Sequence, residues 1–220
     1  MASVTKLSRR EAVSLAAAGA GGLAISEILR NLPRAATKVA LTPVIEKVLN
    51  DPGSPSAGAA NPDVTVVLFT DYQCPVCKAT DPALERLLRA DSKVRVIFKD
   101  WPIFGARSRA AARAALAAAR QGKYLALHQG LMDARVELDG PQLRRIAASV
   151  GIDQRQLADD EARFRAALDA QLGKHAMQAW SLGLAGAPAY LVGPYLYQGG
   201  LDETHLAQAV RRGRRAGPPV

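Results

Sequence analysis

The two cysteines are the residues whose type and spacing most directly indicate chemistry. Cys74 and Cys77 are the only cysteines in the 220 residues, and Pro75 and Val76 separate them. They follow the apolar run 64–69, which predicts a strand that leads into a helix. At a helix start, unpaired backbone N–H groups and the helix dipole favour the thiolate form of the first sulfur. Cys74 is therefore the candidate nucleophile for attack on a disulfide.

Two other uses of a cysteine pair fit this sequence poorly. A structural disulfide stabilises most by closing a long loop in the unfolded chain, and this two-residue gap closes almost none. A closed zinc site takes about four ligands, such as a second cysteine pair or a close histidine pair. His128, His175 and His205 are scattered, and we interpret each as a surface or helix-packing residue. We expect no metal site and no cofactor.

Residues 1–36 resemble an export segment. The first ten residues include three basic residues and no acidic one, and residues 12–25 form a weakly hydrophobic, Ala/Gly-rich stretch. About 14 residues are too few to span a bilayer comfortably. Arg9 and Arg10 resemble the pair of a twin-arginine signal, although Ala12 stands where an aromatic residue or leucine is usual. A general secretory signal fits the same composition.

Export would place the cysteines in an oxidising compartment, where disulfides form and persist. We therefore expect a periplasmic or other extracytoplasmic location. No clear cleavage site follows the apolar stretch, so removal near residues 35–36 and retention as a short membrane anchor are both open. An ordinary amphipathic helix is a third possibility, but the Ala/Gly run lacks a polar face.

The net charge of +9 is concentrated towards the two ends of the chain. The first 36 residues hold five basic and two acidic residues, a net +3, and a second basic cluster consists of Arg211, Arg212, Arg214 and Arg215. We expect residues 213–220 to form a basic, flexible tail. Nucleic-acid binding would favour a basic face with interleaved aromatic residues on the folded body, so we expect no nucleic-acid partner.

The rest of the chain predicts one α/β domain with helices inserted into it. Residues 37–62 predict a helix at 43–49 followed by a Pro/Gly-rich linker. Residues 63–212 predict the domain itself, which is interrupted by a helical insertion at about 106–182.

The expected elements of the domain follow from hydrophobic period and turn residues. A strand at 64–70, a helix at about 74–90 and a strand at 94–98 form a β-α-β unit with a right-handed crossover. Inserted helices are expected at 108–120, 123–135, 141–150 and 155–182. Gly193-Pro194 joins the last two strands, 189–192 and 195–198, as a hairpin. A final helix runs from an Asp202 N-cap to about Arg212.

This order of elements describes a thioredoxin fold with an inserted helical subdomain. Residues 69–78, Phe-Thr-Asp-Tyr-Gln-Cys-Pro-Val-Cys-Lys, resemble the active-site segment of the DsbA-like thiol-disulfide oxidoreductases of the thioredoxin superfamily. Residues 99–105, 123–128 and 183–190 resemble later landmarks of that family in the same order. The resemblance covers about residues 45–212.

The resemblance implies a second half of the site at Ala187-Pro188. In the family this proline is cis and lies against the cysteine pair, and its bend exposes backbone that can pair with an extended peptide. Substrate contacts are therefore expected at Ala187, Pro188, Pro75 and Val76. Ala187 departs from the family's common threonine and removes a hydroxyl near the sulfurs.

The sulfur chemistry then assigns different roles to the two cysteines. We expect Cys74 to be exposed with a lowered pKa, and Cys77, one helical turn further on, to be the buried partner that resolves or re-forms the redox-active disulfide. Pro75-Val76 includes no cation that would stabilise the thiolate, so we expect a moderate oxidant whose Cys74 pKa is not below about 4.

The supporting residues are less distinctive. Asp71 could relay a proton to Cys77, or it could be a cap or turn residue, and Lys99 is a similar candidate. Tyr72, Trp101 and Phe104 could form an apolar rim for unfolded substrates or could pack in the core.

Three functions fit these features. The favoured one is an oxidase that exchanges its disulfide with cysteines of unfolded or cysteine-containing exported proteins and is served by a membrane or soluble redox partner. A disulfide isomerase or reductase of the same fold is the second. A chaperone that binds Cu(I) through the two thiols is the third.

Overall fold

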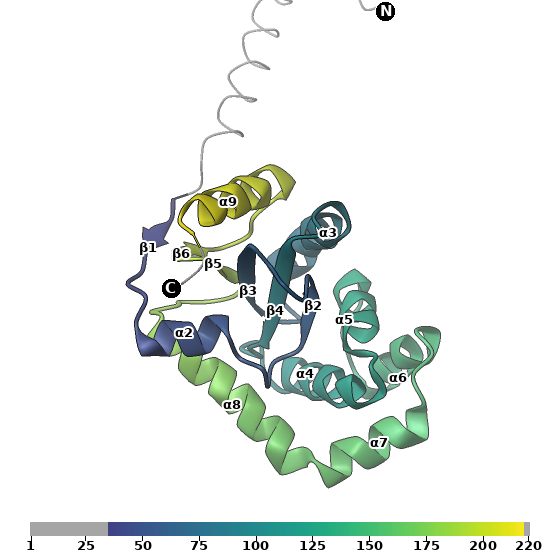
Figure 1. Ribbon diagram of the computed structural model, residues 1–220. Helices are drawn as coiled ribbons and strands as arrows, with labels where there is room; N and C mark the ends of the chain where they lie inside the picture. Colours follow the sequence, from purple (N-terminus) through teal and green to yellow (C-terminus); the bar gives the residue numbers. More distant parts are fainter. Residues whose placement is uncertain (1–34, 218–220) are drawn as a thin grey trace, which may run out of the picture. The chain divides into compact units, whose positions relative to one another are not determined.

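The computed structural model describes residues 35–217, so nearly all of the predicted export segment and the last three residues lie outside the described residues. Within that range the strands form a 6-stranded mixed sheet in the order β1-β6-β5-β3-β4-β2 (Figure 1). Their bounds are β1 Thr37–Lys38, β2 Ser56–Gly58, β3 Val64–Thr70, β4 Val94–Asp100, β5 Ala189–Val192 and β6 Tyr195–Gln198.

The β-α-β unit predicted around the cysteines is present. β3 and β4 pair in parallel, with Leu68 opposite Phe98, and α3 (Pro75–Ala90) connects them. β5 is antiparallel to β3 on its other side and continues into β6 through the predicted turn at Gly193. The end of β3 that leads to Cys74 therefore lies beside the start of β5.

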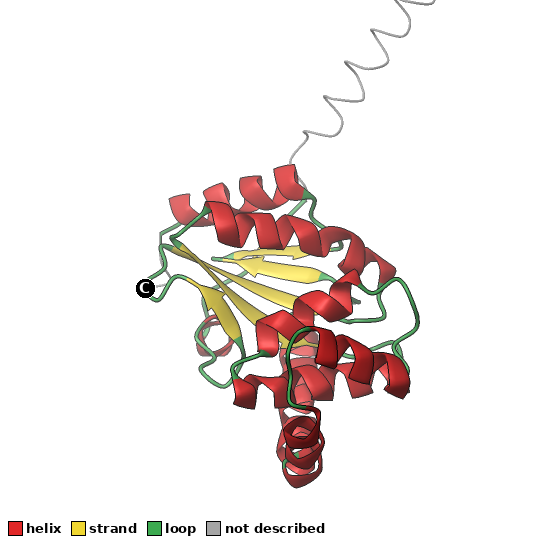
Figure 2. Ribbon diagram, turned by 90° about the vertical axis from the view of Figure 1, so that its right-hand side faces the viewer, coloured by secondary structure: helices red, strands yellow, loops and turns green. Residues whose placement is uncertain are grey.

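Helices cover both faces of the sheet (Figure 2). Side chains alternate between the two faces along a strand, so Leu68 and Phe98 pack in one core with both cysteines. Phe69 and Ile97 belong to the opposite core, which also includes residues of α2 (Pro43–Leu49) and α8 (Arg165–Ser181).

A helical insertion separates β4 from β5. It consists of α4 Ala106–Ala118, a short 3-10 turn Ala119–Gln121, α5 Tyr124–Asp133, α6 Gly140–Ser149, α7 Gln154–Arg163 and α8. The segment expected as one helix at 155–182 is broken at Phe164, where the guanidinium of Arg120 lies 3.6 Å from the ring centroid. The thioredoxin fold with an inserted helical subdomain is thus confirmed. No helix between residues 35 and 217 has the length and apolar character needed to cross a bilayer.

The segment expected as a linker includes an edge strand. β2 pairs antiparallel with β4, and β1 pairs with β6 at the opposite edge. Both strands are too short, and β2 too rich in small residues, for an alternating apolar pattern to reveal them. The predicted helix at 43–49 is present, and the Thr42 hydroxyl caps it by accepting from the backbone N–H of Ile45.

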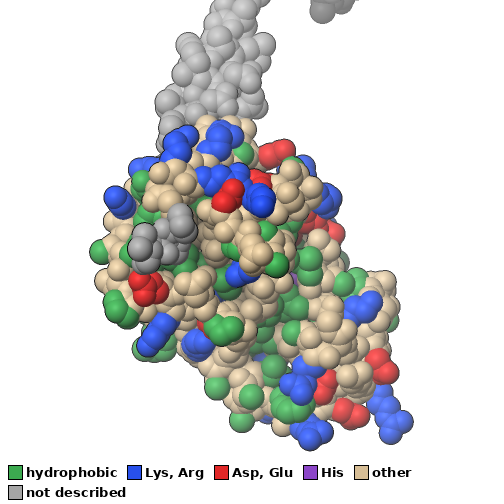
Figure 3. Space-filling view, in the orientation of Figure 1, with side chains coloured by type: hydrophobic (Ala, Val, Ile, Leu, Met, Phe, Trp, Pro, Cys, Tyr) green, Lys and Arg blue, Asp and Glu red, His purple; other side chains and the backbone are tan. Residues whose placement is uncertain are grey.

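The C-terminal helix continues past its expected end. α9 (Glu203–Arg215) begins at the predicted Asp202 cap but includes the first three residues of the segment expected to be a flexible tail. Arg214 explains the difference, since its guanidinium pairs with Asp63 and Asp91 at 2.7 Å each. On the face in Figure 3, acidic and basic side chains lie side by side near α9 rather than forming an all-basic stripe.

Candidate active site

Cys74 occupies the N-cap position of α3. Its backbone is extended, and its sulfur accepts a hydrogen bond from the backbone N–H of Cys77 at 3.4 Å. Pro75 fits the first helical position because the N–H it lacks would have no partner there. Both cysteines are free thiols, so the structure describes the reduced pair.

The two thiols have very different acidities. A hydrogen bond from the Cys77 thiol, assisted by the backbone N–H groups of Cys77 and Val76, lowers the pKa of Cys74 to about 6 against the opposing effect of burial. That value lies above 4, in line with the moderate thiolate stabilisation expected from Pro75-Val76. The same shared hydrogen bond and burial raise the pKa of Cys77 far above its usual range. Cys74 is therefore the sulfur that ionises first.

The expectation that Cys74 is exposed is wrong. Only 2% of the residue is accessible, as for Cys77, whereas Pro75 and Val76 are exposed. The loop before β5 shields the Cys74 sulfur from solvent. The backbone oxygen of Ala187 in this loop lies 3.4 Å from the sulfur.

The Ala187–Pro188 peptide bond is cis, as the resemblance implies. The Pro188 carbonyl oxygen accepts from the backbone N–H of Gly199, which fixes the loop to the end of β6. The pairing of β5 with β3 brings this loop to Cys74. Of the four predicted contact residues, Pro75 and Val76 follow Cys74 at the start of α3, and Ala187, which precedes Pro188, contacts its sulfur.

Asp71 lies at the end of β3 as a buried carboxylate with four donors. It accepts from the backbone N–H groups of Gln73, Ile103 and Phe104 and from the hydroxyl of Ser108, at 2.6–3.1 Å. These contacts favour the cap-and-turn interpretation, since they tie the active-site loop to the start of the insertion.

The Asp71 carboxylate is not among the groups that hydrogen-bond to the Cys77 thiol. The backbone of Asp71 and the hydroxyl of Thr70 hydrogen-bond to it and partly offset the rise in its pKa. Thr70 carries no distinctive signal in the sequence. Its position at the end of a strand before a cysteine pair is too common to be a signal.

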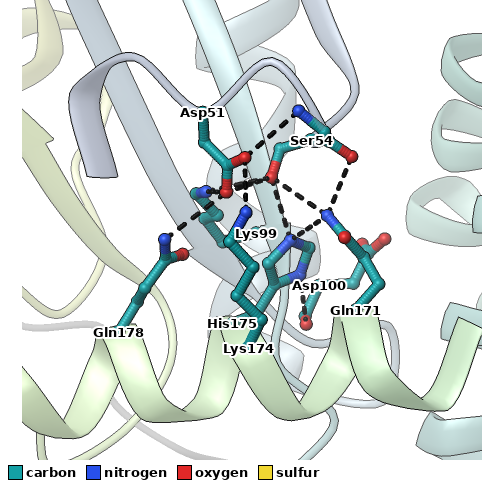
Figure 4. A network of polar contacts seen from close by, with 9 residues as sticks. Asp51, Ser54, Lys99, Asp100, Gln171, Lys174, His175 and Gln178 are labelled. Atoms are coloured by element: carbon teal, nitrogen blue, oxygen red, sulfur yellow. Dashed lines mark hydrogen bonds and ion pairs between the residues drawn. The ribbon is translucent and has the colours of Figure 1, made fainter. Parts of the chain in front are cut away.

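Lys99 lies in the other core of the molecule, away from the cysteines. Its amine is fully buried and donates to the Asp51 carboxylate at 2.5 Å and to the Ser54 hydroxyl at 2.9 Å (Figure 4). Because Phe98 faces the cysteine core, its neighbour in the strand must face away. The idea that Lys99 serves Cys77 is therefore wrong.

His175 belongs to the hydrogen-bond network that surrounds Asp51, which accounts for its burial. His175 of α8 contacts Ser54, Gln171 and the Asp100 backbone oxygen (Figure 4). Hydrogen bonds from Lys174 and Lys99 outweigh burial and hold the pKa of Asp51 well below its usual range. The network joins the segment before β2, the sheet and the insertion.

Of the three aromatic residues considered for an apolar rim, two are buried, as are the two remaining histidines. Tyr72 and Trp101 are buried, and Phe104 is 52% exposed, so only Phe104 fits the proposed apolar rim. The Tyr72 hydroxyl lies 3.0 Å from His128, which contacts Asp81 of α3. His128 and His205 are buried, which supports packing roles over surface ones.

A second buried polar group lies at the end of β4. Tyr124 donates to one Asp100 oxygen at 3.0 Å, and burial raises the pKa of Asp100 to about 6. No spacing rule connects Asp100 with Tyr124 or Asp81 with His128, so the sequence carried no signal for either pair. Between residues 35 and 217, the His, Cys, Asp and Glu side chains form no cluster of three or more that could hold a metal ion.

The fold, the capped cysteine pair and the cis-proline loop define a thiol-disulfide oxidoreductase of the thioredoxin superfamily. A family model described as "DSBA-like thioredoxin domain" matches residues 65–211. The chain belongs to the family of DsbA-like thioredoxin domains.

Solved structures agree with this assignment. A thioredoxin-like oxidoreductase from Silicibacter pomeroyi is 38% identical with a TM-score of 0.73, over 77% of this chain and 97% of that one. The thiol-disulfide exchange protein alpha-DsbA2 from Wolbachia pipientis is 27% identical with a TM-score of 0.73, over 76% and 90%. The catalytic domain of Proteus mirabilis ScsC is 31% identical with a TM-score of 0.70, over 77% and 94%.

Curated relatives found by sequence are longer proteins. A Na(+)/H(+) antiporter, NhaA 3 from Salinispora tropica, is 30% identical over 159 residues, which are 70% of this chain and 24% of the antiporter. The chain thus spans about a quarter of the length of that relative, and the likeness says nothing about transport.

Proposed function

We propose that this protein oxidises cysteine pairs of unfolded or cysteine-containing exported proteins through a mixed disulfide at Cys74. The contact between the Cys74 sulfur and the backbone oxygen of Ala187 carries the proposal. It places a sulfur with a lowered pKa directly beside backbone that can pair with an extended peptide.

The exchange proceeds in two balanced steps. A substrate thiolate attacks Cys74 of the oxidised pair, the Cys74–Cys77 bond breaks, and Cys77 leaves and takes up a proton. The second substrate thiolate then attacks its neighbour's sulfur in the mixed disulfide and releases Cys74 as a thiolate. Two electrons pass from substrate to protein. The lowered pKa of Cys74 favours the second step, because a more acidic thiol is a better leaving group.

The same proposal includes an extracytoplasmic location and a redox partner. Residues 1–36 have the composition of a twin-arginine-like or general secretory signal. A similar solved structure is that of a periplasmic thioredoxin-like protein from Salmonella enterica serovar Typhimurium, 31% identical. Turnover as an oxidase requires a membrane or soluble partner that accepts the two electrons.

Refolding of ribonuclease tests the direction. We expect the oxidised protein to restore activity to reduced ribonuclease, and Cys74→Ser to abolish this. Recovery of activity from scrambled ribonuclease alone, with a reduced cysteine pair at steady state, would instead support the isomerase. Cys77→Ser, mixed with scrambled ribonuclease, should attack a ribonuclease disulfide through Cys74 and accumulate a mixed disulfide that mass spectrometry locates at Cys74. Attachment at any other residue would contradict the mechanism.

A further inference from the structure

Two open cavities lie near the start of α3, on the side of the helical insertion. One, of about 330 Å³, lies between the start of α3 and the loop that follows α5; the other, of about 500 Å³, lies between that loop and the start of α4. They share Gln73, the residue before Cys74, and Glu137. We call the two together the insertion groove, lined by Gln73, Pro75, Lys78, Phe104, Ala106, Arg107, Ala134, Arg135, Val136 and Glu137.

The insertion groove has exposed apolar side chains at both ends. Phe104 and Val136 are each 52% exposed, and α4 and α5 lie between them along the chain. The backbone N–H of Phe104 is held by Asp71, so the ring is carried on a fixed loop while its side chain is free to contact a ligand. Two such side chains provide an apolar surface within the insertion groove.

The side chains that line the insertion groove carry a net positive charge. Three cations, Lys78, Arg107 and Arg135, accompany one carboxylate, Glu137, which already pairs with Arg107 at 2.8 Å. Within residues 35–217 no carboxylate lies at ion-pair distance from Lys78 or Arg135. The Lys78 amine donates instead to the Ala134 backbone oxygen at 2.5 Å, and burial and the nearby Arg135 lower its pKa.

We infer that the insertion groove binds the substrate segment next to the reacting cysteine and favours segments that combine an apolar residue with acidic ones. This inference rests on the proposed function and adds a substrate preference to it. Gln73 and Pro75 flank Cys74 and line the groove, so a peptide joined to the Cys74 sulfur extends into it within a few residues. Acidic side chains there would meet Lys78 and Arg135.

Exchange rates with two matched peptides test the inference. Each peptide has the same cysteine pair and the same flanking leucine, followed by two glutamates in one and two lysines in the other. With the oxidised protein at low ionic strength, we expect the acidic peptide to react about 3- to 10-fold faster, with the ratio falling as salt is added. Arg135→Glu should bring the ratio to one or below, and Phe104→Ala should slow both peptides.

Arg89→Glu is the matched control, because this exposed arginine lies at the far end of α3 and should leave the ratio unchanged. Reduction of each variant by dithiothreitol verifies an intact Cys74–Cys77 pair. Equal rates for the two peptides, or a preference that persists in Arg135→Glu, would overturn the inference alone. Failure of both peptides to react, with dithiothreitol still effective, would count against the proposed function.

Discussion

The Cys74 sulfur lies 3.4 Å from the backbone oxygen of Ala187, although 113 residues separate the two in sequence. The whole helical insertion lies between them along the chain. Pairing of β5 with β3 is what closes this distance, with Phe69 opposite Ala189. The nucleophile and the proposed peptide-binding backbone are therefore positioned by one sheet.

The Cys74 thiol should titrate near pH 6. Alkylation of the reduced protein at Cys74 should reach half its maximal rate close to that pH, whereas an unperturbed thiol does so near 8.5. Because folding lowers this pKa, the thiolate stabilises the reduced fold at pH above the unfolded value, and that stability is lost as pH falls through 6.

Substitution of Cys77 tests the cause of that shift. The Cys77 side chain makes the largest contribution to the lowered pKa, so Cys77→Ala should raise the Cys74 pKa by about one unit or more. Cys77→Ser keeps a donor at the same position and should raise it less. Titrations of both variants that match that of the wild-type protein would show that the backbone N–H groups alone set the pKa.

Asp71→Asn should destabilise the fold by about 3 kcal/mol, because the new amide would present donors to N–H groups that now meet an oxygen. Urea unfolding measures the change. Ser108→Ala removes a single donor to the same carboxylate and should cost about 1 kcal/mol. If Asp71→Asn kept full stability but slowed release of Cys77 from its disulfide, the proton-relay role would be supported instead.

Protonation of His175 should make the fold sensitive to acid. Its Nδ1 faces the Asp100 backbone oxygen and so carries the proton, leaving Nε2 to accept from Gln171 or Ser54. Burial, with Lys99 nearby, lowers the His175 pKa to about 3.

The unfolded chain therefore binds this proton at higher pH than the folded one, and stability falls as pH drops from about 6.5 towards 3. We expect His175 to account for a loss of about 3 kcal/mol by pH 4. Chemical unfolding at several pH values measures this slope, which His175→Gln should flatten between pH 6.5 and 4. A variant with the wild-type slope would exclude His175 as the cause.

Gly58 should tolerate alanine far less well than Gly105. Both have positive φ angles, +94° and +89°, but an added Cβ at Gly58 would lie 2.3 Å from the Val94 backbone oxygen, whereas at Gly105 it would meet nothing within 4 Å. Gly105→Ala should cost about 1 kcal/mol from backbone strain alone. Gly58→Ala should cost several kcal/mol more, because it forces β2 away from β4. Equal unfolding free energies for the two variants would mean that the close approach is not maintained in solution.

The sequence predicted the elements whose pattern is local. The β3 run and the cysteine spacing placed a strand, a turn and a helix in order, and hydrophobic period placed most of the inserted helices. The two edge strands were missed because their residues carry no alternation. The extra turn of α9 was missed because Arg214 is held by Asp63 and Asp91, which are distant in sequence.

The sequence by itself predicted which atoms would do the chemistry, since its two cysteines stand in one helix-start motif and form a single candidate redox pair, with Cys74 as the candidate nucleophile. Tertiary structure alone decided their surroundings. It covered Cys74 with the Ala187 loop, turned Lys99 to the opposite face of the sheet, and surrounded Asp71 with donors that include Ile103 and Phe104 of the loop after β4 and Ser108 of α4. Burial and hydrogen bonding depend on contacts between segments far apart in the chain, and no local pattern encodes them.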